Sequence, residues 1–218
     1  IVTTEMARKV AEVNGLACFD TFTGFKFLAQ KKDQLEESGE GNVIMSYEES
    51  YGYMLGSYVR DKDAVTAAVA MTEMAAYYAG KGMTLYDALL ALYEKYGNYG
   101  ERTMNLVMPG LDGLKKMAEL MVSLRTNPPK KIGGEAVVQW KDYLDGSLVD
   151  AAIPNKVTME LSGSNVLRYE LADGTSIIVR PSGTEPKVKV YILAQGASQA
   201  DCADKVARYS AWAEGLKD

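Results

Sequence analysis

The sequence lacks histidine altogether and contains only two cysteines among its 218 residues. Cys18 and Cys202 lie far apart in the chain, so we expect no disulfide framework and assign both residues to packing. This sparing use of cysteine is typical of proteins from a reducing compartment. We therefore expect a cytoplasmic location.

Long hydrophobic runs and an excess of basic residues are also missing. No apolar run approaches the roughly 18–20 residues that a membrane-spanning helix needs, and the first ten residues lack the layout of a secretion signal. The net charge of −5 argues against a nucleic-acid partner, which would require a strong basic excess. Any anionic ligand must therefore be bound by a few local lysines and arginines.

The overall composition is that of a globular protein, with 47% hydrophobic and 24% charged residues. A chain of this length forms one large or two modest domains. Residues 127–134 hold two prolines followed by two glycines, which predicts a linker. The predicted fold class is an α/β domain with a partial mixed sheet in residues 1–126, followed by an α+β domain with an antiparallel sheet in residues 135–218.

Apolar periodicity, capping residues and turn signals predict the elements of each domain. In the first domain, we predict helices at Glu5–Asn14, at Phe25–Glu37, at Ala64–Ala79 with Val65 and Val69 facing inward, after Thr84, and at Gly110–Arg125, with strands at Leu16–Thr21, Val43–Ser46 and Gly100–Val107. In the second domain, we predict strands at Glu135–Tyr143, Val166–Leu171, Ser176–Arg180 and Val188–Ala194, a loop at Leu144–Pro154, and a closing helix at Ser198–Leu216.

The stretch Arg180-Pro-Ser-Gly-Thr-Glu-Pro-Lys187 lies between two predicted strands and gathers anion-binding groups. Gly183 lacks a Cβ and permits a positive φ, so backbone N–H groups can closely approach a bound group. Ser182 and Thr184 add hydroxyl donors, while Arg180 and Lys187 add positive charge. These residues predict a site for a phosphate monoester.

A Ser-Gly pair flanked by prolines is also ordinary turn chemistry, so both interpretations stay open on spacing alone. The clustering of donors and cations favours the phosphate site. Glu185 would repel a phosphate unless it pairs with Arg180 or Lys187, or faces a sugar hydroxyl. The sequence does not choose among these arrangements.

Two other polar clusters follow predicted strands of the first domain, where open α/β sheets collect their ligands. Thr23 and Gly24 follow one strand, and Glu48 with Ser50 follows the next. Carboxylates and hydroxyls at such places can hydrogen-bond to sugar hydroxyls. A solvated acidic loop is the alternative for the second cluster. Lys62, between Asp61 and Asp63, could contact the same ligand, but on sequence alone it is just as easily a surface charge.

Taken together, these motifs resemble the α-D-phosphohexomutase family. Arg180–Lys187, with the Val-Lys-Val-Tyr-Ile that follows, is similar to the phosphate-binding loop of that family's fourth domain. Tyr47-Glu-Glu-Ser-Tyr-Gly-Tyr53 is similar to the sugar-binding loop of its third domain, and it looks more like the phosphoglucomutase branch than the phosphomannomutase branch. Thr21–Lys26 and Asp61-Lys-Asp63 resemble neighbouring substrate-side segments.

The resemblance implies an isomerase of carbohydrate metabolism, an intramolecular phosphotransferase that interconverts glucose 1-phosphate and glucose 6-phosphate. It also implies Mg²⁺ in the full-length enzyme and glucose 1,6-bisphosphate as intermediate or activator. The implied phosphate contacts are Arg180, Ser182, Gly183, Thr184 and Lys187, and the implied sugar contacts are Thr23, Gly24, Glu48, Ser50 and Lys62.

The chain departs from the family pattern in two places. It has neither the Ser-His-Asn loop that carries the family's catalytic serine nor the Asp-Gly-Asp-x-Asp-Arg loop that carries its Mg²⁺ ligands. We therefore expect a carboxy-terminal portion, with most of domain three and all of domain four, that is inactive without its amino-terminal domains. Its ligand would be a phosphorylated hexose. A phosphomannomutase or phosphopentomutase portion and a non-catalytic phosphosugar-binding module stay open.

Overall fold

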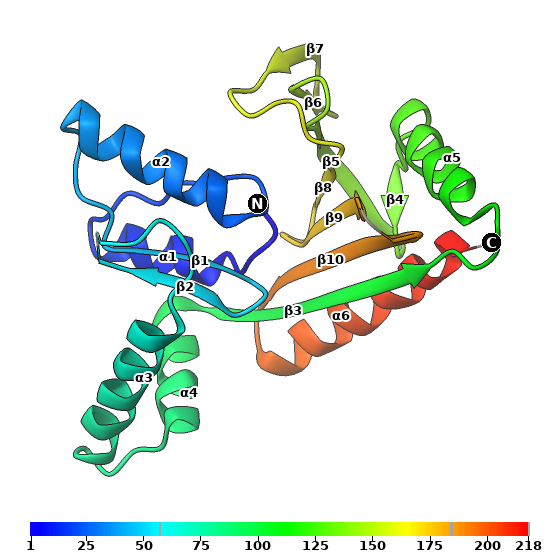
Figure 1. The fold of residues 1–218 in the computed structure, drawn as a ribbon. Coiled ribbons are helices and arrows are strands. Elements are labelled where there is room, and N and C mark those ends of the chain that lie inside the picture. Colours follow the sequence, from blue (N-terminus) through cyan, green and yellow to red (C-terminus); the bar gives the residue numbers. More distant parts are fainter. Residues whose placement is uncertain (57, 184, 218) are drawn as a thin grey trace. The chain divides into compact units, whose positions relative to one another are not determined.

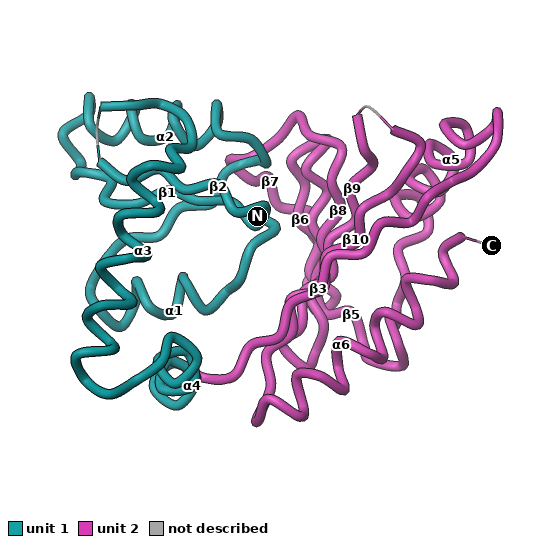
Figure 2. The backbone as a smooth tube through the Cα atoms, turned by 60° about the horizontal axis from the view of Figure 1, so that its bottom comes forward, with its two compact units in different colours: residues 1–96 teal, residues 97–218 magenta. Residues whose placement is uncertain are grey.

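The computed structural model describes residues 1–56, 58–183 and 185–217 of the chain. Their elements fall into two compact units, residues 1–96 and residues 97–218, which Figure 2 colours separately. Within the described residues, no helix combines the length and the apolar character that crossing a bilayer requires.

The first unit combines helices with an antiparallel hairpin (Figure 1). Strand β1 pairs with β2, and the rings of Tyr47 and Tyr53 stack across the hairpin with their centroids 6.3 Å apart. The elements of this unit are α1 (Met6–Val13), α2 (Phe25–Ser38), β1 (Met45–Glu48), β2 (Gly52–Leu55), α3 (Ala64–Ala79) and α4 (Leu85–Tyr96).

Side-chain caps fix the starts of α3 and α4, as predicted. The carboxylate of Asp63 accepts a hydrogen bond of 2.9 Å from the backbone N–H of Val65. Before α4, the N–H of Asp87 donates to Thr84 Oγ1 at 3.1 Å, and the N–H of Thr84 donates to Asp87 Oδ2 at 2.8 Å. This reciprocal pair is a capping box, and it satisfies N–H groups that the helix itself leaves unpaired.

Other predictions for the first unit are wrong. Leu16–Thr21, predicted as a strand, has no regular secondary structure. The strand predicted at Val43–Ser46 begins only at Met45. Val65 and Val69 are exposed instead of inward, and no residue of α3, all of which are described, is buried. Apolar residues lie all around α3, so periodicity could not single out an inner face.

The second unit is an antiparallel sheet that helices cover on one face, which confirms the predicted α+β class. The strand order is β3-β10-β9-β8-β5-β6-β7, with β4 paired to β5. Figure 1 shows α6 running along β3 and β10. The elements are β3 (Asn98–Val107), α5 (Gly113–Thr126), β4 (Lys131–Ile132), β5 (Glu135–Asp142), β6 (Ser147–Asp150), β7 (Ile153–Thr158), β8 (Leu167–Leu171), β9 (Ser176–Pro181), β10 (Lys187–Gly196), α6 (Gln199–Glu214) and the 3₁₀ turn η1 (Gly215–Lys217).

The core of this unit lies between the sheet and the helices α5 and α6. Val188, Val190 and Ile192 of β10 are fully buried there, together with Met121 of α5 and Tyr209 of α6. These strand residues are two positions apart, as the alternation of side chains along a strand requires. The residues between them must therefore point to the opposite face of the sheet.

That opposite face carries three cations at the loop end of β9 and β10. Lys187 and Lys189 alternate with the buried valines of β10. Arg180 follows the buried Val179 on β9 and pairs with Lys189 in the register of the two strands. The pleat thus separates the charged side chains from the apolar core.

The boundary between the units differs from the predicted one. Strand β3, which the sequence assigned to the first domain, pairs with β10 along its whole length, and its buried residues Met104 and Leu106 join the core of the second unit. The predicted linker at residues 127–134 contains β4, whose Ile132 is 0% exposed. Gly133 and Gly134 form the turn into β5 with φ of 54° and 89°. The prolines and glycines there mark a turn in a packed hairpin.

The loop predicted at Leu144–Pro154 is wrong as well, because it contains β6 and the start of β7. The turn into β6 is fixed by Asp145, whose carboxylate accepts a hydrogen bond of 3.0 Å from the N–H of Ser147. Gly146 adopts a φ of 72° within it. An Asp-Gly pair is a hairpin signal, so this turn was present in the sequence.

Candidate functional site

The connection between β9 and β10 is a loop closed at its neck by hydrogen bonds. The N–H of Ser182 donates to the carbonyl of Lys187 at 2.9 Å, next to the last strand pair, Pro181 and Val188. Inside the loop, the N–H of Glu185 donates to Ser182 Oγ at 3.3 Å. Because these bonds fix both ends, the loop needs little reordering to receive a ligand.

Gly183 plays a different part from the one predicted. Its φ lies outside the left-handed region, and a Cβ built on it meets no described atom within 4 Å. The backbone turn therefore does not require glycine here. The missing side chain leaves open space beside the loop. Thr184, predicted to add a hydroxyl donor, lies outside the described residues.

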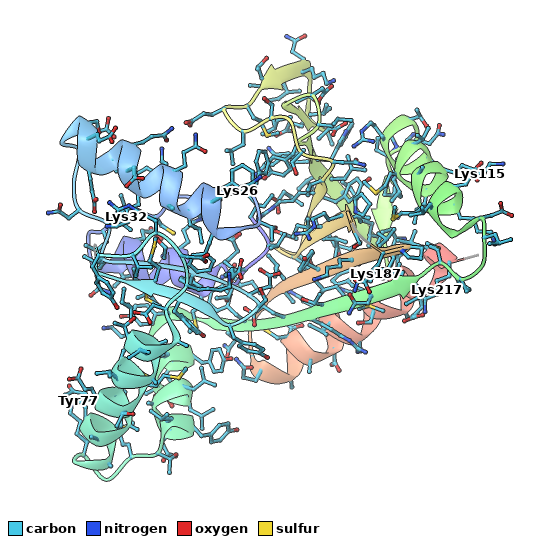
Figure 3. The ribbon with its side chains drawn as sticks, in the orientation of Figure 1. Lys26, Lys32, Tyr77, Lys115, Lys187 and Lys217 are labelled. Atoms are coloured by element: carbon cyan, nitrogen blue, oxygen red, sulfur yellow. The ribbon has the colours of Figure 1, made fainter. Side chains whose placement is uncertain are left out.

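The two cations of the predicted phosphate site differ in their partners. Lys187 Nζ lies 2.5 Å from the carboxylate of Glu185, so the acidic residue of the loop pairs with its lysine (Figure 3 labels Lys187). The guanidinium of Arg180 makes no hydrogen bond or ion pair with any described residue. Arg180 thus offers a planar donor fork suited to phosphate oxygens.

A charge network farther along the same face neutralises another arginine. Arg168 donates to Glu170 at 2.7 Å and to Ser176 Oγ at 2.9 Å, and Lys141 lies 3.4 Å from the same carboxylate. Burial acts to raise the pKa of Glu170, but Arg168, the hydrogen bond from Ser176 and Lys141 outweigh it and hold the pKa below its ordinary value. Glu170 is therefore committed to these partners.

In the first unit, the tip of the β1–β2 hairpin holds Glu48 at the end of β1, opposite Gly52. A Cβ built on Gly52 would lie 2.6 Å from Cε2 of Phe25 and 3.0 Å from Oε1 of Glu48. Between them, Tyr51 adopts a φ of 65°, the positive region that non-glycine residues seldom occupy. Strained backbone of this kind concentrates at ligand-binding loops. Ser50 is exposed at the tip.

The ring of Phe25 also joins the other predicted sugar residues. Lys62 Nζ lies over it, 5.1 Å from the ring centroid, although the same ammonium also contacts Asp61 at 3.1 Å. Thr23 and Gly24 directly precede it, and Thr23 Oγ1 is a buried hydroxyl with no hydrogen-bond partner among the described residues. Three segments that are distant in sequence thus meet at one aromatic ring.

A cavity of about 800 Å³ within the first unit brings part of this set together. Thr23, Gly24, Glu48 and Glu49 line it, together with apolar side chains of α1 and α2. Ser50 and Lys62 are not among its lining residues. Charged residues such as Arg8, Asp20 and Lys31 line it too. A cavity that combines apolar walls with hydroxyl and charged groups can orient a polar ligand.

Sequence reasoning did not single out Phe25 or Lys189, which the structure places next to the predicted site residues. Phe25 belongs to the segment that resembles a substrate-side loop and starts a predicted helix, but nothing in the sequence shows that it packs against Gly52. Lys189 was interpreted as part of a strand, although its register partner is Arg180. Strict alternation in Lys187-Val-Lys189-Val was the signal that could have placed both lysines on the face of Arg180.

The described residues offer no set of carboxylate or cysteine side chains close enough together to hold a metal ion. The donor set for Mg²⁺, which prefers several oxygen ligands in octahedral geometry, is therefore not provided by this part of the chain.

Residues 1–96 match the family domain described as "Phosphoglucomutase/phosphomannomutase, alpha/beta/alpha domain III", and residues 111–208 match the "Phosphoglucomutase/phosphomannomutase, C-terminal domain". The chain belongs to the phosphoglucomutase/phosphomannomutase family. The two matches occur in the order predicted from the motifs, and the second ends in α6.

Relatives in sequence agree with this membership in the phosphoglucomutase/phosphomannomutase family, and a solved structure shares the fold. A phosphoglucomutase from Staphylococcus aureus strain bovine RF122 / ET3-1 is 35% identical over 206 residues, and one from strain USA300 is 34% identical over 206. Each alignment covers 94% of this chain and 37% of the relative, so the chain spans little more than a third of these proteins. The solved structure of the open form of pp63/parafusin from Paramecium is similar at a TM-score of 0.62 and 20% identity. The match covers 98% of this chain and 36% of the pp63/parafusin chain, and it supports the fold.

Proposed function

We propose that the chain is the substrate-binding portion of a phosphohexomutase that interconverts glucose 1-phosphate and glucose 6-phosphate through a bisphosphate intermediate. The observation that carries the proposal is the guanidinium of Arg180, without a described partner, beside the open space at Gly183. The family match and the phosphoglucomutase relatives support the same reaction.

The proposed phosphate contacts come from the β9–β10 loop. Arg180 donates through its fork, Ser182 through its hydroxyl, and the backbone at Gly183 lies close to the anion. Lys187 contributes a charge that Glu185 partly offsets. Thr184 belongs to this proposal by its place in the motif.

The proposed sugar contacts come from the first unit. Glu48 accepts hydrogen bonds from sugar hydroxyls, and Thr23, Ser50 and Lys62 donate to them. Gly24 allows close approach of the backbone at the start of α2, where its φ is 121°. Each of the two units thus carries one part of substrate recognition, which is our assignment of their roles.

The chemistry of the whole enzyme needs groups beyond these residues. A phosphoserine that exchanges phosphoryl groups, Mg²⁺ that neutralises them, and glucose 1,6-bisphosphate as intermediate or activator belong to the proposal for the complete protein. The residues of this chain bind and orient the sugar phosphate. The complete protein is proposed to act in the cytoplasm.

Magnitudes indicate how tightly this portion would bind by itself. Charge-assisted hydrogen bonds contribute about 1.5–3 kcal/mol each, and three or four can form here. Association costs on the order of 4–15 kcal/mol. The balance is marginal, so we expect millimolar or weaker binding of a hexose phosphate and no mutase turnover by this chain alone.

A titration followed by backbone amide shifts tests the proposal. Glucose 1-phosphate, glucose 6-phosphate and mannose 6-phosphate are added to the chain, with Arg180→Ala as the site variant and Lys115→Ala on α5 as the charge-matched control. We expect shifts at Ser182 and Gly183 that disappear in Arg180→Ala and persist in Lys115→Ala. Larger shifts at Glu48 and Ser50 with mannose 6-phosphate than with the glucose phosphates would favour a phosphomannomutase. Mutase turnover by this chain alone would contradict the proposal that the chain only binds and orients the substrate.

A further inference from the structure

Arg60 joins the connection between β2 and α3 to helix α2. Its Nε lies 2.5 Å from Oδ1 of Asp33, and its Nη2 lies 3.5 Å from Oε2 of Glu36. Asp33 and Glu36 are three positions apart on α2, so they lie on the same face of that helix. The planar guanidinium of Arg60 therefore bridges two carboxylates, a task that suits its forked donors better than the point charge of a lysine.

This bridge rests on a buried charge of α2. The side chain of Lys32, labelled in Figure 3, is 1% exposed, and its ammonium donates to the carboxylate of Glu36. Because a buried ammonium needs a carboxylate partner, Lys32 holds Glu36 in place. Lys32, Glu36, Arg60 and Asp33 thus form a row of alternating charge from the interior of the first unit to the connection.

A second contact holds the other end of the connection. The N–H of Asp63 donates to the carbonyl of Tyr53 on β2 at 2.8 Å, and the carboxylate of Asp63 caps α3. Lys62 lies between Arg60 and Asp63 in the chain, and its ammonium lies over the ring of Phe25, the first residue of α2. The backbone that carries Lys62 is therefore fixed to α2 on one side and to β2 on the other.

We propose that Arg60 is a positioning residue for sugar recognition: it ties the connection to α2 and so holds Lys62 over Phe25, where Lys62 donates to a hydroxyl of the hexose. This inference rests on the proposed function, in which Lys62 is a sugar contact. Arg60 itself does not touch the ligand, since its guanidinium binds the two carboxylates of α2. Without Arg60, Lys62 would keep its contact with the adjacent Asp61 but would lose its fixed place over the ring.

A surface ion pair without a positioning role is the competing explanation. The side chains of Arg60 and Asp33 are 42% and 43% exposed, and ion pairs of this exposure contribute little to stability. The two explanations differ in what the loss of Arg60 changes. A plain surface pair leaves the place of Lys62 and the binding of the hexose as they are, whereas a positioning residue alters both.

The test compares Arg60→Met and Arg60→Lys with the control Lys9→Met, all in the whole chain. Lys9 belongs to an exposed ion pair of α1 in the same unit, and its removal changes the net charge as much as Arg60→Met does. NMR shifts of the Lys62 side-chain protons report their place over the ring without ligand, and thermal unfolding shows that each variant folds. Titrations with glucose 1-phosphate and with inorganic phosphate then follow the backbone amides of Glu48 and Ser182.

In Arg60→Met, we expect the Lys62 protons to move toward random-coil shifts and glucose 1-phosphate to bind about threefold more weakly. Inorganic phosphate should keep its wild-type affinity, because it has no sugar hydroxyl for Lys62 to bind. Arg60→Lys keeps the charge without the fork and should fall between Arg60→Met and wild type. Asp33→Asn, which removes one of the two carboxylates, should move the Lys62 protons in the same direction by less. Lys9→Met should match wild type throughout.

Two results would overturn the proposal directly. Wild-type shifts of the Lys62 protons in Arg60→Met would mean that Arg60 does not position the lysine. Equal weakening of glucose 1-phosphate binding in Arg60→Met and Lys9→Met would reduce the effect to net charge.

The outcomes also separate this inference from the function on which it rests. If Arg60→Met displaced Lys62 but bound glucose 1-phosphate as wild type does, the positioning role would be overturned and the phosphate site of the β9–β10 loop would remain. If the wild-type chain showed no amide shift with either compound up to high millimolar concentration, the proposed function of this chain would fail, and the role of Arg60 in sugar recognition with it.

Discussion

The ring of Phe25 occupies the place that a side chain on Gly52 would need: a Cβ there would lie 2.6 Å from Phe25 Cε2. Phe25 is 5% exposed and starts α2, whereas Gly52 starts β2. This contact joins the helix to the hairpin that carries Glu48. Glycine is therefore required at this position by packing and not by backbone conformation.

Replacing Gly52 with alanine tests that requirement. The added methyl group overlaps a buried ring, and overpacking of this kind costs about 1–3 kcal/mol of unfolding free energy. Gly80→Ala is the matched control in the same unit, because its φ is −60° and its nearest contacts are at 3.5 Å. Urea unfolding should show a lower midpoint for Gly52→Ala and an equal or higher midpoint for Gly80→Ala. Equal midpoints for Gly52→Ala and wild type would show that the ring can move aside.

The position of Lys62 should depend on the aromatic ring of Phe25. A cation over an aromatic ring is stabilised by about 0.5–1 kcal/mol at exposed sites. The ring current also changes the NMR chemical shifts of protons that lie above the ring. In Phe25→Leu, we expect the side-chain protons of Lys62 to move toward random-coil shifts, while Phe25→Tyr keeps them near the wild-type values. Lys26, which lies 4.8 Å from the ring of Phe27, is the internal control and should be unaffected. Unchanged Lys62 shifts in Phe25→Leu would show that Asp61 alone holds the lysine.

Local signals predicted much of the fold because their causes are local. Asp63 and Thr84 start helices through hydrogen bonds to residues two or three positions away, and the sequence shows both partners. The pairing of β3 with β10 joins residues about ninety positions apart, such as Met104 and Val190, and no local pattern encodes it. For that reason the predicted boundary fell at a Pro-Gly turn instead of near Gly97.

The same distinction applies to the candidate sites. The β9–β10 loop is one continuous stretch, so its donors could be predicted from the motif. The partners of its cations could not be predicted in this way. The register that sets Lys189 opposite Arg180, for example, appears only in the folded sheet. The cluster around Phe25 draws on three separate segments, and only the structure brings them together.

Glu170 should make the stability of the second unit depend on acid pH. Its pKa is lowered in the folded chain, so its contribution is present above its unfolded pKa of about 4.3 and is lost as pH falls through the folded value. In Glu170→Gln, Arg168 loses its charged partner, and we expect about 1–3 kcal/mol less unfolding free energy at pH 7. Denaturant unfolding from pH 7 to pH 3 measures both effects.

The difference between wild type and Glu170→Gln should shrink as the pH falls below about 4, because the wild-type carboxyl then becomes protonated. Glu119→Gln on α5 is the control, since its carboxylate is largely exposed and lies 3.8 Å from Lys115. It should differ from wild type by less than about 0.5 kcal/mol at every pH. If the difference in unfolding free energy between wild type and Glu170→Gln stayed constant from pH 7 to pH 3, the charge of Glu170 would not contribute to stability.

Gly183 offers the clearest separation of stability from binding. Its φ is outside the left-handed region and a Cβ meets no described atom within 4 Å, so alanine fits the loop. Gly183→Ala should therefore unfold at the same free energy as wild type or up to about 1 kcal/mol higher, since alanine restricts the unfolded chain. It should nevertheless weaken phosphate binding, because the methyl group occupies the space that we assign to the ligand.

Gly133→Ala is the matched control in the same unit. There φ is +54° and a Cβ would lie 3.0 Å from Cδ1 of Tyr209, so alanine should cost about 1–3 kcal/mol. Thermal unfolding and a glucose 1-phosphate titration on both variants give the comparison. If Gly183→Ala kept wild-type stability and wild-type affinity together, the open space beside the loop would not be where the phosphate binds, and the donors of Arg180 and Ser182 would have to meet it from another side.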